Sequence, residues 1–131
     1  MAVLIDSSVW IAAASAKNKE CLKLRRLIQA DELIYICRPI QAEVCQGART
    51  EEQFHQLWEG FLGFEFLPMT DRAWGLSAWN YFKCRKKGLT ISTLDCLIAT
   101  LAHEHRVPLW SLDQVFRKIQ SQVGFELYEG A

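Results

Sequence analysis

The sequence has no excess of charge of either sign, because 15 lysine and arginine residues balance 15 aspartates and glutamates over 131 residues. A chain without net charge has no global positive field to attract a polyanion, so nucleic-acid binding would need a local basic patch or a bound cation. The 50% hydrophobic and 23% charged residues exclude the class of disordered chains. A chain of this length is expected to form a single domain, residues 1–131.

Two further patterns are missing from the sequence. The five cysteines contain no CxxC pair, which excludes a zinc ribbon or a thioredoxin-type site and favours reduced, mostly buried thiols. No stretch approaches the ~20 apolar residues of a membrane span. The apolar N-terminal segment lacks a basic leading region and is interrupted by Asp6, unlike a signal peptide. We therefore expect a cytoplasmic protein without membrane association.

Hydrophobic patterning predicts strands that alternate with helices, without repeats or linkers. The predicted strands are residues 2–6, 33–37, 65–69, 108–113 and 125–128. The predicted helices are residues 7–16, 20–30, 39–48, 51–62, 70–88, 94–106 and 114–122. This alternation favours an α/β fold with a mainly parallel sheet covered by helices on both faces. The functional crevice of such a fold lies beyond the carboxyl ends of its strands.

Four acidic residues are expected to converge at that edge of the sheet. Asp6 and Asp113 end predicted strands. Asp95 lies in the first turn of its predicted helix, and Glu43 lies in the helix after the second strand. Carboxylates held close together repel one another, so they take up protons or bind cations. An oxygen-only set favours a hard ion such as Mg²⁺ or Mn²⁺.

Each acid taken alone also has a structural interpretation. Asp95 has capping-box spacing with Ser92 and is more often a helix-terminus residue. Asp113 is equally suited to cap the last helix, and Glu43 lies on a helix of unknown orientation. Asp6 is different, because an acid that closes a buried strand has little structural purpose. Together the four favour a shared cation site more strongly than any one of them does.

The chain resembles the PIN-domain ribonucleases, and within them the VapC-type toxins of toxin–antitoxin pairs. The resemblance covers essentially the whole chain and rests on VLIDSSVWI, on QAEVCQGA around Glu43, and on KKGLTISTLDCLIATLAHEHRVPLWSLDQVF. It implies a PIN-like three-layer α/β/α fold. Ser8 matches the family's small polar residue two positions after the first Asp, and Ser111 its Thr/Ser two before the last. The positions that match the family's metal-binding acids are Asp6, Glu43, Asp95 and Asp113.

The resemblance implies a metal-dependent endoribonuclease that uses Mg²⁺ or Mn²⁺ to hydrolyse RNA with an activated water. It also implies a cognate VapB-like antitoxin, held in a groove, and a homodimer. Many relatives carry a second acid two positions after the last Asp, where this sequence has Val115. One negative charge fewer leaves open whether the site binds one ion or two.

Other features allow more than one interpretation. His103 and His105 point about 200° apart on a helix, so we reject a shared zinc site. Tryptophans on the amphipathic helices are either core residues or the lining of an exposed groove; these are Trp10, Trp58, Trp74 and Trp79. One dense basic run is either a solvated helix end or a patch for the phosphates of single-stranded or looped RNA. It consists of Lys83, Arg85, Lys86 and Lys87.

Rival functions remain. A PIN-domain nuclease that processes RNA outside a toxin–antitoxin pair fits the same residues, and so does a catalytically silent PIN module that binds RNA or protein. The loss of an acid would favour the silent module, but all four are present. A haloacid dehalogenase-type phosphatase needs a second Asp where Ser8 stands. A receiver domain needs an acidic pair that the first strand lacks.

Overall fold

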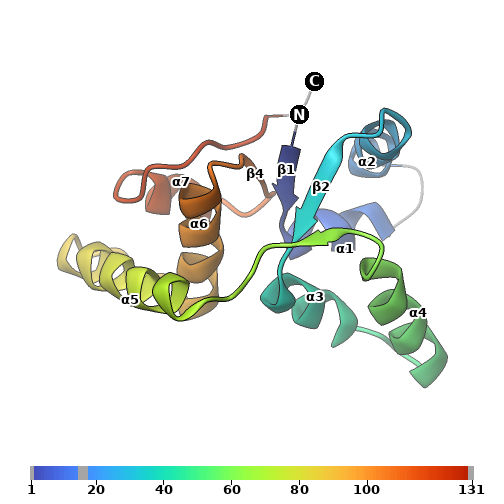
Figure 1. Ribbon diagram of the computed structural model, residues 1–131, viewed down its shortest axis with the longest axis horizontal. Helices are drawn as coiled ribbons and strands as arrows, with labels where there is room; N and C mark the ends of the chain where they lie inside the picture. Colours follow the sequence, from blue (N-terminus) through green and yellow to red (C-terminus); the bar gives the residue numbers. More distant parts are fainter. Residues whose placement is uncertain (1, 15–17, 130–131) are drawn as a thin grey trace.

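The computed structural model describes residues 2–14 and 18–129, and it is built on a four-stranded sheet whose strands are all parallel (Figure 1). The strand order is β3-β2-β1-β4. The strands are β1 (Ala2–Ile5), β2 (Leu33–Ile36), β3 (Glu65–Phe66) and β4 (Leu109–Trp110). The helices are α1 (Ser7–Ala14), α2 (Lys19–Gln29), α3 (Arg38–Cys45), α4 (Glu51–Phe61), α5 (Asp71–Lys86), α6 (Thr93–His105) and α7 (Val115–Gln120).

Strand β1 lies inside the sheet because its side chains are apolar on both faces. Val3, Leu4 and Ile5 are almost completely buried. Successive side chains of a strand point to opposite faces, and accordingly Val3 and Ile5 belong to a cluster with residues of α1 and α2. Leu4 belongs to the cluster formed with α6 and α7. Figure 1 shows these helix pairs on opposite sides of the sheet, which confirms the predicted three-layer arrangement.

Capping groups define several helix boundaries. Thr50 Oγ1 accepts a hydrogen bond from the Gln53 N–H (3.0 Å), and Gln53 Oε1 accepts the Arg49 N–H (2.8 Å), at the start of α4. Helix α5 ends at Lys86, and Gly88 has a φ of 78°, a conformation that glycine adopts without strain. Asn18 caps α2 by accepting the Cys21 N–H (2.9 Å), a cap that the sequence patterns did not reveal. The predicted helix 7–16 extends to Ala14 in α1, and residues 15 and 16 lie outside the described ranges.

Strands β1 and β2 end one residue before the predicted strands 2–6 and 33–37, whereas two other predicted strands are shorter by three residues or more. The prediction for 65–69 was too long, because β3 ends at Phe66 and Pro68 has no N–H for the ladder. The prediction for 108–113 was also too long, because β4 ends at Trp110. Beyond Trp110, two backbone N–H groups donate to serine hydroxyls and not to a neighbouring strand. Leu112 donates to Ser8 Oγ and Asp113 to Ser111 Oγ, both at 3.0 Å. Asp113 therefore lies in the loop after β4.

The predicted strand 125–128 is reduced to a single bridge beside β4. The Leu109 N–H donates to the Glu126 carbonyl (2.9 Å), and the Tyr128 N–H donates to the Leu109 carbonyl (2.7 Å). These bonds give one parallel bridge between Leu109 and Leu127. The segment thus covers the outer edge of β4, an edge that would otherwise expose unpaired backbone groups.

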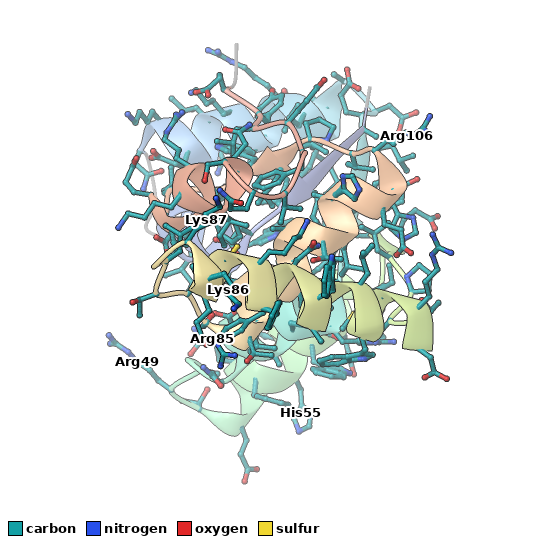
Figure 2. All side chains as sticks on the ribbon, turned by 90° about the vertical axis from the view of Figure 1, so that its left-hand side faces the viewer. Arg49, His55, Arg85, Lys86, Lys87 and Arg106 are labelled. Atoms are coloured by element: carbon teal, nitrogen blue, oxygen red, sulfur yellow. The ribbon has the colours of Figure 1, made fainter. Side chains whose placement is uncertain are left out.

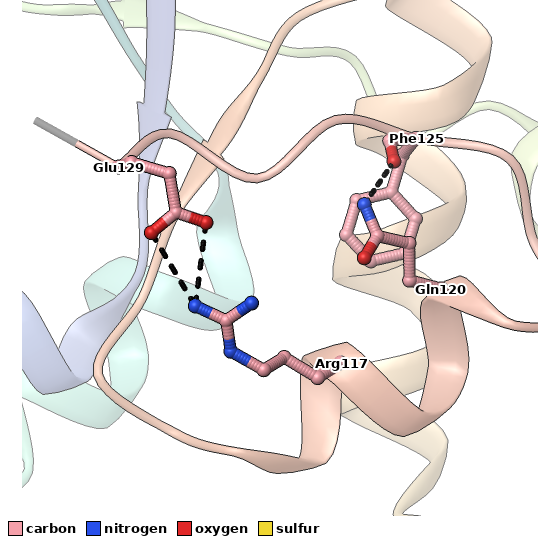
Figure 3. A network of polar contacts seen from close by, with 4 residues as sticks. All are labelled: Arg117, Gln120, Phe125 and Glu129. Carbon is pink, nitrogen blue, oxygen red and sulfur yellow. Dashed lines mark hydrogen bonds and ion pairs between the residues drawn. The ribbon is translucent and has the colours of Figure 1, made fainter.

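Side chains of α7 hold this C-terminal segment in place (Figure 3). Arg117 forms an ion pair with Glu129 (3.3 Å). Gln120 Nε2 donates to the Phe125 carbonyl (2.8 Å). Helix α7 directly follows the loop that carries Asp113, so these contacts also anchor that loop.

Helix α5 crosses α6 on the outside of the molecule and packs against it (Figure 1). The buried Asn80 amide donates to Thr100 Oγ1 across this interface (3.0 Å). Four of the five cysteines are buried and all five are free thiols, as the sequence predicted. Within the described ranges, no helix is both long and apolar enough to cross a membrane.

Candidate functional site

Asp6 directly follows β1 and is 4% exposed. Its backbone N–H donates to the Trp110 carbonyl (2.9 Å), which fixes the end of β1 against β4. Its Oδ2 accepts hydrogen bonds from Ser8 Oγ and Ser111 Oγ, each at 2.8 Å. The two supporting serines named from the sequence therefore meet on one carboxylate oxygen of Asp6. A buried carboxylate is tolerated when such donors partly satisfy it.

The same two hydroxyls connect Asp6 to the loop of Asp113. Ser8 and Ser111 lie 3.2 Å apart, and each also accepts a backbone N–H from this loop. One serine comes from the first turn of α1 and the other from the residue after β4. The network therefore ties two segments more than a hundred residues apart to the same carboxylate.

Glu43 points from α3 toward the same region. Its Oε2 accepts a hydrogen bond from Ser7 Oγ (3.4 Å), whereas its Oε1 is buried and has no hydrogen-bond partner among the described residues. Burial raises the pKa of the Glu43 carboxyl, and the charges of Asp6 and Asp95 raise it further. Ser7 was missed by the sequence analysis, and the only signal was its position directly after Asp6.

Asp95 is the third residue of α6 and is partly buried. Its backbone N–H donates to Ser92 Oγ (3.0 Å), so the predicted N-terminal cap is present. Burial raises the pKa of the Asp95 carboxyl, a hydrogen bond with Ser92 lowers it, and the charges of Asp6 and Asp113 raise it again. The backbone N–H of Asp95 forms the helix cap with Ser92, while the charges of Asp6 and Asp113 act on its carboxylate.

Asp113 combines the two interpretations that the sequence left open. Its Oδ1 accepts the Val115 N–H (3.0 Å) at the start of α7, which is a helix-terminus role. Its charge also raises the pKa values of both Glu43 and Asp95. Asp113 is exposed, whereas Asp6 is buried, so the two mark the outer and inner sides of the site.

The four acids interact electrostatically and have no basic partner in the described part of the chain. Among the described residues, no lysine or arginine forms an ion pair with any of them. The orphaned Glu43 Oε1, the raised carboxyl pKa values and the oxygen-only donors fit a hard divalent cation. The described side chains do not, as positioned, place three or more ligands around one point. Binding would thus require side-chain adjustment.

The Cys37 thiol lies beside the acids but remains a neutral group. Burial raises the pKa of Cys37 to about 12, and Asp6 and Glu43 contribute to the increase. A protonated thiol is a poor metal ligand. Cys37 therefore does not change the oxygen character of the site.

The basic run occupies the last turn of α5, and Figure 2 shows Arg85, Lys86 and Lys87 together at this end of the helix. Lys83 lies in the same turn. In the described part of the chain, no hydrogen bond or ion pair joins these residues to the acids. The short segment 88–92 leads from this basic end to the start of α6, which carries Asp95.

The remaining sequence candidates lie apart from the acids. His103 contacts the Gly124 carbonyl through Nδ1, and His105 lies 3.9 Å from Glu104. Among the tryptophans, Trp10 is partly buried against the core, whereas three others are exposed to different degrees. These are Trp58, Trp74 and Trp79.

An all-parallel sheet with acids at its carboxyl edge defines an α/β domain whose site lies at the ends of its strands. The model of one family, described as "PIN domain", matches residues 3–121. The chain belongs to the PIN-domain family, and the resemblance seen in its motifs is confirmed. Proteins of this family are nucleases. No curated protein sequence matches the chain.

Solved structures share this fold at low sequence identity. VapBC2 from Rickettsia felis, bound to a DNA fragment from the promoter, has a TM-score of 0.79 and 19% identity, with 98% of each chain covered. VapBC-1 from nontypeable Haemophilus influenzae has a TM-score of 0.78 and 16% identity, covering 98% of this chain and 97% of that one. VapC20 from Mycobacterium tuberculosis, a toxin that cleaves the sarcin–ricin loop, has a TM-score of 0.66 and 13% identity, covering 88% and 92%.

Proposed function

We propose that the protein is a Mg²⁺- or Mn²⁺-dependent endoribonuclease that acts as the toxin of a toxin–antitoxin pair. The observation that carries this proposal has two parts. The charges of the four acids act on one another, and Glu43 Oε1 is buried without a hydrogen-bond partner among the described residues. The likeness to VapBC structures and to an RNA-cleaving VapC supports the substrate and the toxin role.

The proposed roles follow from how each acid is held. Asp6, Asp95 and Asp113 would hold the principal ion, with Asp6 oriented by Ser8 and Ser111. Glu43 would bind it through water or orient the attacking water. When bound, such an ion polarises the phosphodiester, brings water to it and stabilises the leaving oxygen. Hydrolysis would leave a 5′-phosphate and a 3′-hydroxyl.

The decisive experiment compares RNA cleavage with and without a divalent cation. The purified protein should cleave RNA in Mg²⁺ or Mn²⁺ and stop in excess EDTA. Asp95→Asn keeps the backbone N–H that Ser92 caps but removes the charge, so this variant should fold and cleave little. Undiminished cleavage in EDTA, or wild-type activity of Asp95→Asn, would show that these acids do not act through a metal.

An antitoxin is the proposed partner, and the structure offers a groove for it. An apolar hollow of about 420 Å³ runs between α1, α2 and α4. Residues that line it include Trp10, Ile11, Leu24, Leu57 and Phe61. We propose that the C-terminal segment of the antitoxin lies there and places an Arg or Lys against Asp6, Asp95 or Asp113, where it competes with the metal.

The alternatives differ in measurable ways. A processing nuclease would cleave RNA in the same manner but would be harmless on expression without a partner. A silent PIN module would bind RNA or protein without cleaving RNA in any divalent cation. The complete set of acids favours the active enzyme over the silent module. The protein is also expected to form a homodimer and to act in the cytoplasm.

A further inference from the structure

Helix α5 carries large aromatic side chains that are left in contact with solvent. Trp79 is 56% exposed, Trp74 45% and Phe82 40%. The rings of Trp79 and Phe82 stack with centroids 5.5 Å apart and planes inclined by 19°. Single exposed apolar residues are common, but a group of exposed rings on one helix marks a surface that binds something.

Cations accompany these rings. Lys86 Nζ lies 5.5 Å from the centre of the Phe82 ring, within the range of a cation–π contact. Arg85 and Lys87 lie beside it at the end of α5 (Figure 2). Within the described ranges none of these three forms an ion pair with a carboxylate, so their charges are available to a polyanion. Sites that bind single-stranded nucleic acids combine aromatic rings with cations in the same way.

Helix α4 carries a second exposed stacked pair, and the guanidinium of Arg38 from α3 lies 5.9 Å from the centre of its Trp58 ring. Phe54 and Trp58 lie 6.1 Å apart with planes at 11°. Helix α4 contains no lysine or arginine but has three glutamates, which are Glu51, Glu52 and Glu59. The two pairs have similar ring geometry, but Arg38 also donates to Gln41 Oε1 (2.7 Å) and lies over the Phe66 ring (4.2 Å). The larger number of lysine and arginine residues favours nucleic-acid binding at α5 over α4.

A hollow lies between another side of α5 and the start of α6. It measures about 220 Å³ and is lined by Trp74, Ser77, Ala78, Tyr81 and Thr93. Two of its walls are the rings of Trp74 and Tyr81, and Thr93 begins α6 two residues before Asp95. This hollow lies close to the helix start that carries the acid and is separate from the Trp79–Phe82 pair.

We propose that the exposed side of α5 formed by Trp79, Phe82 and Lys86 binds single-stranded RNA by stacking its bases. This inference rests on the proposed ribonuclease function and adds the mode of substrate binding. Bases within a duplex have no free face to stack, so the surface selects unpaired RNA. Stacking accepts every base, so the contact strengthens binding without specifying sequence.

The test separates base stacking from backbone attraction. In EDTA, which prevents cleavage, the affinity of the protein is measured for a short single-stranded RNA and for an abasic strand of the same length. Trp79→Leu, which keeps an apolar side chain but removes the ring, should weaken RNA binding about fivefold to a hundredfold. It should leave abasic-strand binding unchanged, and Trp79→Phe should recover most of the loss. Phe54→Leu on α4 is the matched control and should bind RNA as the wild type does.

Several outcomes would overturn the inference. RNA affinity unchanged in Trp79→Leu would exclude stacking, and an equal loss for both strands would point to altered backbone contacts. Light scattering tests the remaining explanation. If Trp79→Leu converts a dimer to a monomer and its affinity for RNA falls no more than its affinity for the abasic strand, this side of α5 is instead a contact between two copies of the chain. Cleavage of RNA by the wild type in Mg²⁺ or Mn²⁺, measured separately, distinguishes failure of this inference from failure of the ribonuclease proposal.

Discussion

Glu43 holds one carboxylate oxygen in a buried position where no described group donates a hydrogen bond to it. Among the described residues, the other oxygen accepts a hydrogen bond from Ser7 alone, and the charges that act on it, Asp6, Asp95 and Asp113, are negative. Burying an unpaired carboxylate costs free energy that the fold does not recover from protein contacts. At the scale of one residue, Glu43 therefore destabilises the protein without a cation and is suited to bind one.

Replacing Glu43 with a neutral residue should stabilise the protein by an amount that depends on pH. The pKa of Glu43 is raised above its ordinary 4.5, so its ionised form is penalised in the folded state at neutral and higher pH. We expect Glu43→Gln to raise the melting temperature at pH 8. The gain should shrink as the pH falls through the raised pKa and vanish below about 4.5, where the group is protonated in both states.

The control for this change is Glu59→Gln on the exposed side of α4, which should give no comparable gain. Added Mg²⁺ should raise the melting temperature of the wild type more than that of Glu43→Gln, because ligand binding stabilises the folded state. A gain of the same size at pH 4 and pH 8 would show that the charge of Glu43 is not the cause.

At the scale of elements, the pair α5 and α6 places two parts of the site relative to each other. Helix α6 carries Asp95, and α5 carries the basic run at its end. The buried hydrogen bond from Asn80 to Thr100 joins the two helices. Cys96 Sγ, which lies 3.5 Å from the Ser77 carbonyl, adds a weaker contact. The packing of this pair thus fixes the position of the basic end of α5 relative to Asp95.

Thr100→Val removes the acceptor of the Asn80 amide at nearly constant volume. A buried donor left without a partner costs about 1–3 kcal/mol, and we expect a loss of that size in the free energy of unfolding measured with urea. Adding Asn80→Leu should restore part of the stability, since both polar groups are then gone. Equal stability of Thr100→Val and the wild type would show that this bond does not hold the helices together.

The end of α5 permits a second element-scale prediction. Replacing Arg85, Lys86 and Lys87 with Ala should weaken RNA binding and reduce its salt dependence. Each lost contact to a single-stranded phosphate lowers the slope of log K against log salt by about 0.7, so three contacts predict a change of about 2. Replacing the exposed Arg25 and Arg26 of α2 is the control. An unchanged slope would mean that the basic run is only a solvated helix end.

At the scale of the whole molecule, the parallel sheet gathers side chains from four separate segments at one edge. The acids come from the ends of β1 and β4 and from two helices, α3 and α6. The apolar hollow between α1, α2 and α4 lies on the side of α1, the helix that begins next to Asp6. A single extended partner segment in this hollow therefore has a route to the acids.

Expression should reveal the partner. The protein alone should arrest growth, co-expression of the cognate antitoxin should rescue it, and replacing the antitoxin's inserted Arg or Lys with Ala should weaken inhibition. Ile11→Glu in the hollow should abolish antitoxin binding while RNA cleavage persists, whereas Leu62→Glu, an equally exposed site outside it, should not. A protein that is harmless alone and copurifies with no small partner would instead be a processing nuclease.

Local sequence patterns were sufficient for the class of fold and for most of the candidate site. The apolar run before Asp6 predicts a buried parallel strand, and Ser92 predicts the start of the helix that carries Asp95. These features depend on neighbouring residues alone, through strand burial and helix capping. Because parallel strands end at a common edge, the convergence of the acids followed from the order of the elements.

Only the tertiary structure decided which way side chains face and where short strands end. The orientation of Glu43 toward Ser7, the end of β4 at Trp110 and the exposure of Trp79 all depend on packing between distant segments. A helix pattern shows that aromatic residues are present but not which of them another element will cover. The serine hydroxyls that end β4 come partly from α1, about a hundred residues away, and no local pattern contains that contact.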